Sequence, residues 1–302
     1  YAATTIGLVY NLHVQRQGIS IHTSGLSANQ LRLLQDLLQQ MLQQDFSEHR
    51  FNELKRQLSR HWRNSSKNKP VARLFSQLSA LLQPQNPEID ILADALEALD
   101  FNSFLQFHQQ LLEQVHIESL MLGNWTSDQA QQLMTLLKQW QTRLPDTGHR
   151  LPNPQFNIQG LGPVWLQLDV EHSDHALVIY LPAQHATPEQ MALFMLANHV
   201  MSPEYFHQLR TEQQLGYLVG TGYVPINMLP GIAFYVQSPN TCCDTLYQAT
   251  VMFFRAFLSD TETLSAEEFA EIKQGILAQL NERDNSLGAR AKRYWLALGQ
   301  QD

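Results

Sequence analysis

The amino-acid sequence predicts an α+β fold built from two similar domains, each with a mostly antiparallel sheet and helices packed on one face. Three observations predict this fold. Segments with helical periodicity alternate with short apolar runs typical of strands, a proline- and glycine-rich stretch divides the chain, and the order of elements repeats on its two sides. The length of 302 residues also exceeds what one ordinary hydrophobic core organises.

Amphipathic helices dominate the first part of the chain, because apolar residues recur there at helical spacing. Ser27 is expected to cap the first helix, and the second is expected from Ser47 to Trp62. Further helices are expected at residues 72–82, 90–99, 102–114 and 127–142. The apolar run 119–122 is expected to be a strand.

The stretch from Leu144 to Pro163 is rich in proline and glycine, which interrupt helices, and it predicts an interdomain linker. Domains are therefore expected at residues 1–145 and 163–302, with the linker at 146–162. Two strands are expected directly after the linker, at residues 164–168 and 177–181.

The second part of the chain then continues with helices and a hairpin. The segment Thr187–Gln190 has the pattern of a capping box with proline at the first helical position. The helix that follows is expected to end near Val200, and Ser202–Pro203 is expected to begin another. Extended runs at 217–224 and 231–237 flank a turn-rich segment and predict a β-hairpin.

A sharp corner between a helix and a strand is expected around Gly216. A short helix from Leu209 to Leu215 would end there, with Gly216 in the left-handed conformation that favours glycine after a helix. Tyr217 then begins an apolar extended run. Arg210 and Tyr217 are thus placed seven residues apart across the corner.

The residues alone leave two interpretations of Arg210 and Tyr217 open. In the first, the arginine lies on the helix surface, paired with Glu212 or Glu204, and the tyrosine packs in the core as strand aromatics usually do. In the second, the guanidinium and the phenol meet at a functional site. A helix that only packs against a core does not require an arginine and a tyrosine in this arrangement.

The two parts of the chain show signs of an internal duplication. Three pairs of segments match in the same order, at an offset that grows slowly along the chain: Ile6–Val9 with Leu215–Leu218, Gly18–Ser24 with Gly231–Ser238, and Ser47–Lys55 with Ser265–Lys273. Each copy has elements that the other lacks at its outer end. The chain is therefore expected to be a piece of a longer array of such units.

Charge and composition limit the partners of the chain. The net charge is −8, and the excess of acidic residues lies entirely in residues 151–302. Such a chain repels phosphate backbones, so nucleic acid is not expected as a partner. No stretch is long and apolar enough to span a membrane, so no membrane partner is expected either. The adjacent Cys242 and Cys243 are expected to be free thiols, which leaves the compartment open.

The sequence contains none of the common catalytic or metal-binding motifs. Neither H-E-x-x-H nor H-x-x-E-H occurs among its twelve histidines, so no metal is expected to bind this chain. The nearest approach, Glu171–His175, is expected to be a solvated turn. There is no G-x-S-x-G elbow, P-loop or dinucleotide fingerprint.

The segment Phe206–Tyr217, together with the later Phe234–Ser238, resembles the C-terminal half of the pitrilysin and insulin-degrading family of zinc metallopeptidases. The resemblance covers nearly the whole chain. Members of this family have four homologous αβ roll domains. The resemblance implies that residues 1–145 are a third-domain-like roll without its N-terminal strands, and that residues 163–302 are a fourth-domain-like roll without its C-terminal part.

The resemblance also implies roles for three residues. Tyr217 and Arg210 match the two residues that the C-terminal half adds to a composite active site, and Phe206 matches an apolar wall of the substrate site. A phenol suits donation to the oxyanion of peptide hydrolysis, and an arginine fork suits the carbonyls of a peptide substrate. Zinc is expected only in the full-length enzyme, on the N-terminal half of the same polypeptide.

The expected function is therefore that of one half of a bacterial zinc metalloendopeptidase, inactive by itself. The alternative is a non-catalytic structural or peptide-holding member of the same fold family. The resemblance favours a periplasmic location, although free thiols would suit the cytoplasm equally well.

Overall fold

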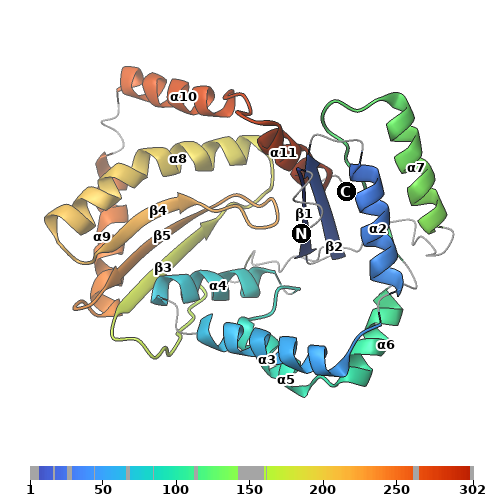
Figure 1. Cartoon of the computed structure of the whole chain (residues 1–302). Helices are drawn as coiled ribbons and strands as arrows, with labels where there is room; N and C mark the ends of the chain where they lie inside the picture. The colour runs from blue at the N-terminus through green and yellow to red at the C-terminus, as the bar shows by residue number, and fades with distance from the viewer. Residues whose placement is uncertain are drawn as a thin grey trace. The chain divides into compact units, whose positions relative to one another are not determined.

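The computed structural model describes residues 7–15, 18–25, 29–43, 45–65, 69–83, 85–111, 115–141, 160, 162–260 and 265–299. The chain forms two compact units that are interleaved along the sequence (Figure 1). The first unit comprises Tyr1–Gln57, Leu96–Asn153 and Arg283–Asp302, and the second comprises Leu58–Ala95 and Pro154–Glu282. The predicted linker lies almost wholly outside the described residues, and the predicted domain boundaries stay a prediction.

The expected helices of the first part of the chain are confirmed. They are α2 (Gln30–Gln43), α3 (Glu48–Ser65), α4 (Pro70–Leu82), α5 (Ile89–Ala98), α6 (Phe101–Leu111) and α7 (Ser127–Gln141). The cap expected from Ser27 lies outside the described residues. The run 119–122 forms no strand, because a short apolar segment pairs only where a neighbouring strand offers an edge. No helix among the described residues has the length and hydropathy needed to cross a membrane.

The first unit combines a two-stranded hairpin with helices. Strands β1 (Leu8–Gln15) and β2 (Gly18–Gly25) pair in antiparallel register. The amide of Gln30, at the start of α2, donates to the carbonyl of Gly25 at 2.7 Å and so ties α2 to the hairpin. Helix α11 (Leu287–Gly299) also belongs to this unit.

An aromatic cluster holds α3 and α6 together in the first unit. The ring centroid of Phe104 lies 4.9 Å from that of Phe46 and 5.3 Å from that of Phe51. The ammonium of Lys55 donates to the carbonyl of Leu99 at 2.6 Å, which caps the end of α5 beside the cluster. The helical periodicity of this region is therefore used for helix-to-helix packing.

The second unit is built on a three-stranded antiparallel sheet. Its strands are β3 (His175–Pro182), β4 (Leu218–Tyr223) and β5 (Gly231–Ser238), in the spatial order β3-β5-β4. The strand expected at 177–181 and the hairpin expected from 217 to 237 are confirmed. The strand expected at 164–168 is absent: Trp165 instead packs against Tyr247, with ring centroids 4.9 Å apart.

Helices cover both faces of this sheet. On one face, α8 (Pro188–Phe206) and α9 (Cys243–Asp260) enclose a buried core, whose fully buried residues include Tyr205, Leu209, Phe234, Val236 and Leu246. On the other face lies α4, with the ring of Phe75 at 5.8 Å from that of Tyr235. Helices were expected on one face of the sheet only, so the cover that α4 gives to the second face was not predicted. It explains why β5 is apolar and buried along nearly its whole length.

Helix α8 is longer than expected. The side chain of Thr187 accepts from the backbone N–H of Gln190 at 3.3 Å, and Pro188 occupies the first turn, as predicted. The helix does not end near Val200, however, and it continues through Pro203. Burial of Tyr205 in the core offsets the backbone hydrogen bond that proline removes.

The corner after α8 is made differently from the prediction. The helix leads into a π-helical turn, His207–Glu212, and the residue in the left-handed region is Gln214, with φ 51°. The N–H of Leu215 donates to the carbonyl of Leu209 at 2.9 Å and closes the corner. Gly216 is required for a steric reason instead, because a Cβ there would meet the carbonyl oxygen of Gln237.

The internal duplication stays a prediction. The order of strands and helices is the same in the two proposed copies. Hairpin β1-β2 is followed by α2 and α3, and hairpin β4-β5 is followed by α9 and α10 (Ala266–Leu280). Helix α10 begins with a complete capping box between Ser265 and Glu268.

Replacing Gly216 by alanine tests the steric interpretation of the corner. The added methyl group would collide with the backbone of β5, so Gly216→Ala is expected to lower the free energy of unfolding by roughly 1–3 kcal/mol. Gly275→Ala is the matched control, since its position inside α10 has open space around it and alanine should add up to about 1 kcal/mol. Urea denaturation of both variants checks this. Equal effects of the two substitutions would contradict it.

Candidate functional site

A group of polar side chains gathers at one end of the second sheet. Gln237 lies near the end of the central strand β5, opposite Ala176 on β3 and Leu218 on β4. Because both neighbours run antiparallel to β5, they begin where β5 ends. Asp174 and Tyr217, each one residue before its strand, therefore flank Gln237.

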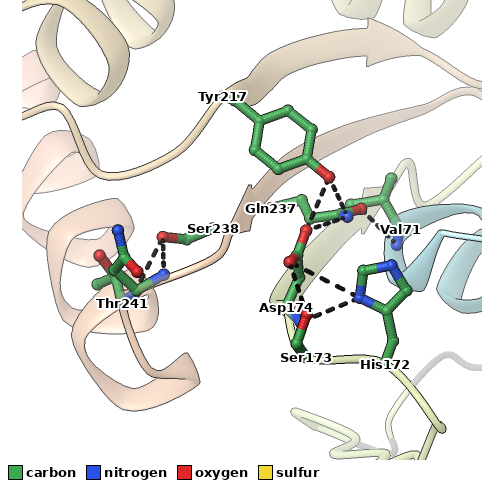
Figure 2. Close-up of polar contacts among 9 residues, drawn as sticks. Val71, His172, Ser173, Asp174, Tyr217, Gln237, Ser238 and Thr241 are labelled. Carbon is green, nitrogen blue, oxygen red and sulfur yellow. Dashed lines mark hydrogen bonds and ion pairs between the residues drawn. The ribbon is translucent and has the colours of Figure 1, made fainter.

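The three side chains form a closed set of hydrogen bonds (Figure 2). The phenol of Tyr217 donates to Oδ2 of Asp174 at 2.7 Å. Nε2 of Gln237 donates to the same oxygen at 2.8 Å and to the phenol oxygen at 2.5 Å. We call Asp174, Tyr217 and Gln237 the phenol network.

The phenol network is anchored to helix α4. Gln237 is fully buried, at 0% exposure, and its Oε1 accepts from the backbone N–H of Val71 at 3.3 Å. Lys69, which precedes α4, holds its ammonium 6.0 Å from the centroid of the Tyr217 ring. This contact is a cation–π interaction at the outer limit of its range.

Hydrogen bonding shifts the pKa values of both ionisable members of the network. The pKa of Asp174 is held below its ordinary value of 3.8, first by the hydrogen bond from Gln237 and then by that from Tyr217. The hydrogen bond to Asp174 raises the pKa of the Tyr217 phenol above 10.0, and loss of hydration and the charge of Asp174 add to this. At neutral pH the network therefore pairs a carboxylate with a protonated phenol.

The structure brings Arg210 and Phe206 to the same corner. The guanidinium of Arg210 donates to the backbone carbonyl of Tyr217 and lies 5.2 Å from the centroid of the Phe206 ring. Phe206 and Tyr217 are 42% and 43% exposed. The corner thus presents a cation, a phenol and an apolar ring to solvent.

The contacts of Arg210 and Tyr217 differ from those that the packing interpretation predicts. Glu212, one of the partners considered for Arg210, instead pairs with His207 at 3.2 Å, across the wide π-helical turn. Tyr217 is too exposed to be a core aromatic. Both residues are held by polar contacts at the surface.

The turn before β3 contains one residue whose surroundings differ from the prediction. Glu171–His175 does form a turn, in which the N–H of Asp174 donates to Nδ1 of His172 at 3.0 Å. The Asp174 side chain is only 10% exposed, so it is not the solvated group that was expected. Within the described ranges, no group of three or more His, Cys, Asp or Glu side chains could hold a metal ion.

Asp174 and Gln237 are the site residues that the sequence did not identify. Gln237 belongs to the segment that carried the family resemblance, but no role was inferred for it. A glutamine near the end of an otherwise apolar, buried strand indicates a buried polar contact. The sequence around Asp174 does not indicate its hydrogen-bond partner Tyr217, which lies 43 residues further along the chain.

Two sequence models of known families match this chain. One describes the middle or third domain of peptidase M16 and matches residues 1–95. The other describes the C-terminal lobe domain 4 of the PQQ synthase PqqF-like proteins and matches residues 196–295. The chain belongs to the M16, or insulinase, peptidase family. Its match is to the C-terminal part of these peptidases, as the resemblance implied.

Individual M16 relatives agree with this assignment. Human insulin-degrading enzyme is 26% identical over 304 residues, which cover 98% of this chain and 29% of that protein. The crystal structure of pitrilysin matches with a TM-score of 0.78 and 20% identity, over 95% of this chain and 30% of that one. The periplasmic protease PqqL from Escherichia coli matches with a TM-score of 0.65 and 12% identity, over 99% of this chain and 33% of that one. The chain therefore spans less than a third of the length of the human relative.

Acid denaturation tests the hydrogen bonds of Asp174. Because its pKa is lower in the folded chain, the carboxylate stabilises the fold above about pH 4, and this contribution is lost as pH falls through the folded pKa. Asp174→Asn removes the charge and keeps an acceptor oxygen. The difference in unfolding free energy between the parent chain and this variant should shrink as pH falls from about 5 to about 2.

Urea denaturation at a series of pH values measures this difference. Asp169→Asn, which removes the same charge from an exposed residue before β3, is the control. A difference for Asp174→Asn that stays constant over the whole pH range would contradict the assignment.

Proposed function

We propose that this chain is the C-terminal, non-zinc-binding half of a zinc metalloendopeptidase that degrades peptides in a closed chamber. In this proposal Arg210 and Tyr217 complete an active site whose zinc is held by the N-terminal half of the same polypeptide. The observation that carries the proposal is the corner itself, where Arg210 contacts both the Phe206 ring and the backbone of Tyr217, and all three residues are exposed. The M16 relatives are named as proteases, which supports it.

Each of these residues has a chemical task in peptide hydrolysis. Tyr217 stays protonated at neutral pH, so its O–H can donate to the oxygen of the scissile carbonyl as negative charge develops there. Arg210 uses one donor on the carbonyl of Tyr217, and its remaining N–H groups are available to backbone carbonyls of a peptide. Phe206 offers an apolar surface for a substrate side chain. Zinc, when bound by the N-terminal half, supplies the activated water.

The proposed location is the periplasm of a bacterium. The support is the fold-level likeness to the periplasmic protease PqqL. Cys242 and Cys243 are free and exposed, and they do not decide between compartments. Cell fractionation with an antibody to this chain tests the location, and recovery in the cytoplasmic fraction would refute it.

The oxyanion role is tested with Tyr217→Phe in the full-length enzyme. Loss of one oxyanion donor should lower kcat/KM for a peptide substrate by about 10²–10³. Tyr223→Phe removes a phenol from the other end of the same strand and should leave kcat/KM within about twofold. An unchanged kcat/KM for Tyr217→Phe would show that the phenol is not the oxyanion donor.

The isolated chain provides a second test. By itself it is expected neither to bind zinc stoichiometrically nor to hydrolyse peptides, because the proposed zinc ligands and general base lie on the N-terminal half. Metal analysis after dialysis and a fluorogenic peptide assay measure both properties. One zinc per chain together with peptide hydrolysis would overturn this division of labour between the two halves.

A further inference from the structure

Polar contacts hold both the phenol oxygen and the backbone carbonyl of Tyr217. Tyr217 lies one position before β4. It follows the corner in which Gln214 adopts the left-handed conformation. Tyr217 is 43% exposed and is not part of the buried core. The phenol oxygen contacts Asp174 and Gln237, and the backbone carbonyl of Tyr217 accepts from Arg210.

The hydrogens of the phenol network can all be assigned. Oε1 of Gln237 accepts the N–H of Val71, so the two N–H bonds of its amide point to Asp174 and to the phenol oxygen. A flipped amide would set its carbonyl oxygen against the carboxylate. Since the phenol oxygen already accepts from Gln237, its single hydrogen is directed to Asp174.

We propose that Gln237 and Asp174 are positioning residues for Tyr217, an inference that rests on the proposed function. Gln237 fixes the phenol oxygen by donating to it. Asp174 accepts the phenol hydrogen while no substrate is present. When a peptide carbonyl becomes negatively charged, rotation about the C–O bond of the phenol redirects the hydrogen to it, and the oxygen stays where Gln237 holds it.

Burial supports this division of tasks between the two residues. Gln237 is fully buried and its amide groups are all bonded, so it has no freedom to follow a moving ring. The Asp174 side chain is 10% exposed, and it keeps the hydrogen bond from Gln237 when the phenol turns away. The resting position of the phenol is thus defined without contact to substrate.

The charged groups around the phenol come from several elements. Lys69 lies over the ring from the start of α4, and Arg210 binds the Tyr217 carbonyl from the π-helical turn. His172 lies behind Asp174, with Nδ1 at 3.7 Å from Oδ1 of the carboxylate. Asp174 is the anion that contacts the phenol oxygen directly.

A double-mutant cycle in the full-length enzyme tests the proposal. Asp174→Ala should lower kcat by about tenfold with little change in KM, because Gln237 loses the carboxylate that keeps its amide directed at the phenol oxygen in the transition state. In the Tyr217→Phe background the same substitution should change kcat by less than about twofold, because its effect passes through the phenol. Asp174→Asn retains an acceptor oxygen and should recover most of the activity.

A spectrophotometric pH titration of the isolated 302-residue chain supplies a readout that does not depend on catalysis. The phenolate absorbance of Tyr217 is obtained as the difference between the parent chain and Tyr217→Phe. Asp174→Ala should move this transition to lower pH, because the hydrogen bond that raises the Tyr217 pKa is gone. If Asp174→Ala does not fold, Asp174→Asn removes the charge that also raises the Tyr217 pKa and should move the transition to lower pH by a smaller amount.

The outcomes separate this inference from the proposed function. If Tyr217→Phe leaves kcat/KM unchanged, the oxyanion role in the proposed function fails, and a shifted titration still supports positioning of the phenol. If Tyr217→Phe is impaired but Asp174→Ala lowers kcat equally in both backgrounds, the positioning role is overturned. A Tyr217 transition that is the same with and without Asp174 would overturn it as well.

Discussion

A single buried amide, that of Gln237, organises one end of the second unit. Its oxygen accepts from the first turn of α4, and its nitrogen donates to groups that precede β3 and β4. Leaving a buried polar group without a hydrogen-bond partner costs about 1–3 kcal/mol of folding free energy. The hydrogen bonds of Gln237 therefore strongly favour this arrangement of its neighbours. The side chain can satisfy all of its groups only when α4, the turn before β3 and the corner before β4 are all in place.

The corner before β4 depends on this end of the sheet in turn. Leu209 is fully buried and anchors the π-helical turn to the core, while Gly216 lets the backbone pass close to the carbonyl of Gln237. The wide turn rotates the residues that follow Phe206 relative to a regular α-helix. As a result Arg210 reaches the backbone of Tyr217. Irregular helical turns of this kind are frequent at functional sites.

Helix α4 gives the second unit a part that its position in the chain does not suggest. It precedes the predicted linker, yet it covers the open face of the β3-β5-β4 sheet and begins beside the phenol network. Val71 and Lys69 therefore belong to the surroundings of Tyr217. The sheet has helices on both faces for this reason, and its central strand is buried along nearly its whole length.

The sequence by itself determined the α+β class, the helices of the first part of the chain, the hairpin, and Phe206, Arg210 and Tyr217 as the residues of interest. Periodicity and turn residues are local, and a family resemblance can be recognised from residues that are adjacent in the chain. Only the tertiary structure decided the continuation of α8 past Pro203, the left-handed Gln214, and the contacts of Asp174 and Gln237. These depend on burial and on hydrogen bonds between residues far apart in the sequence, which no local pattern encodes.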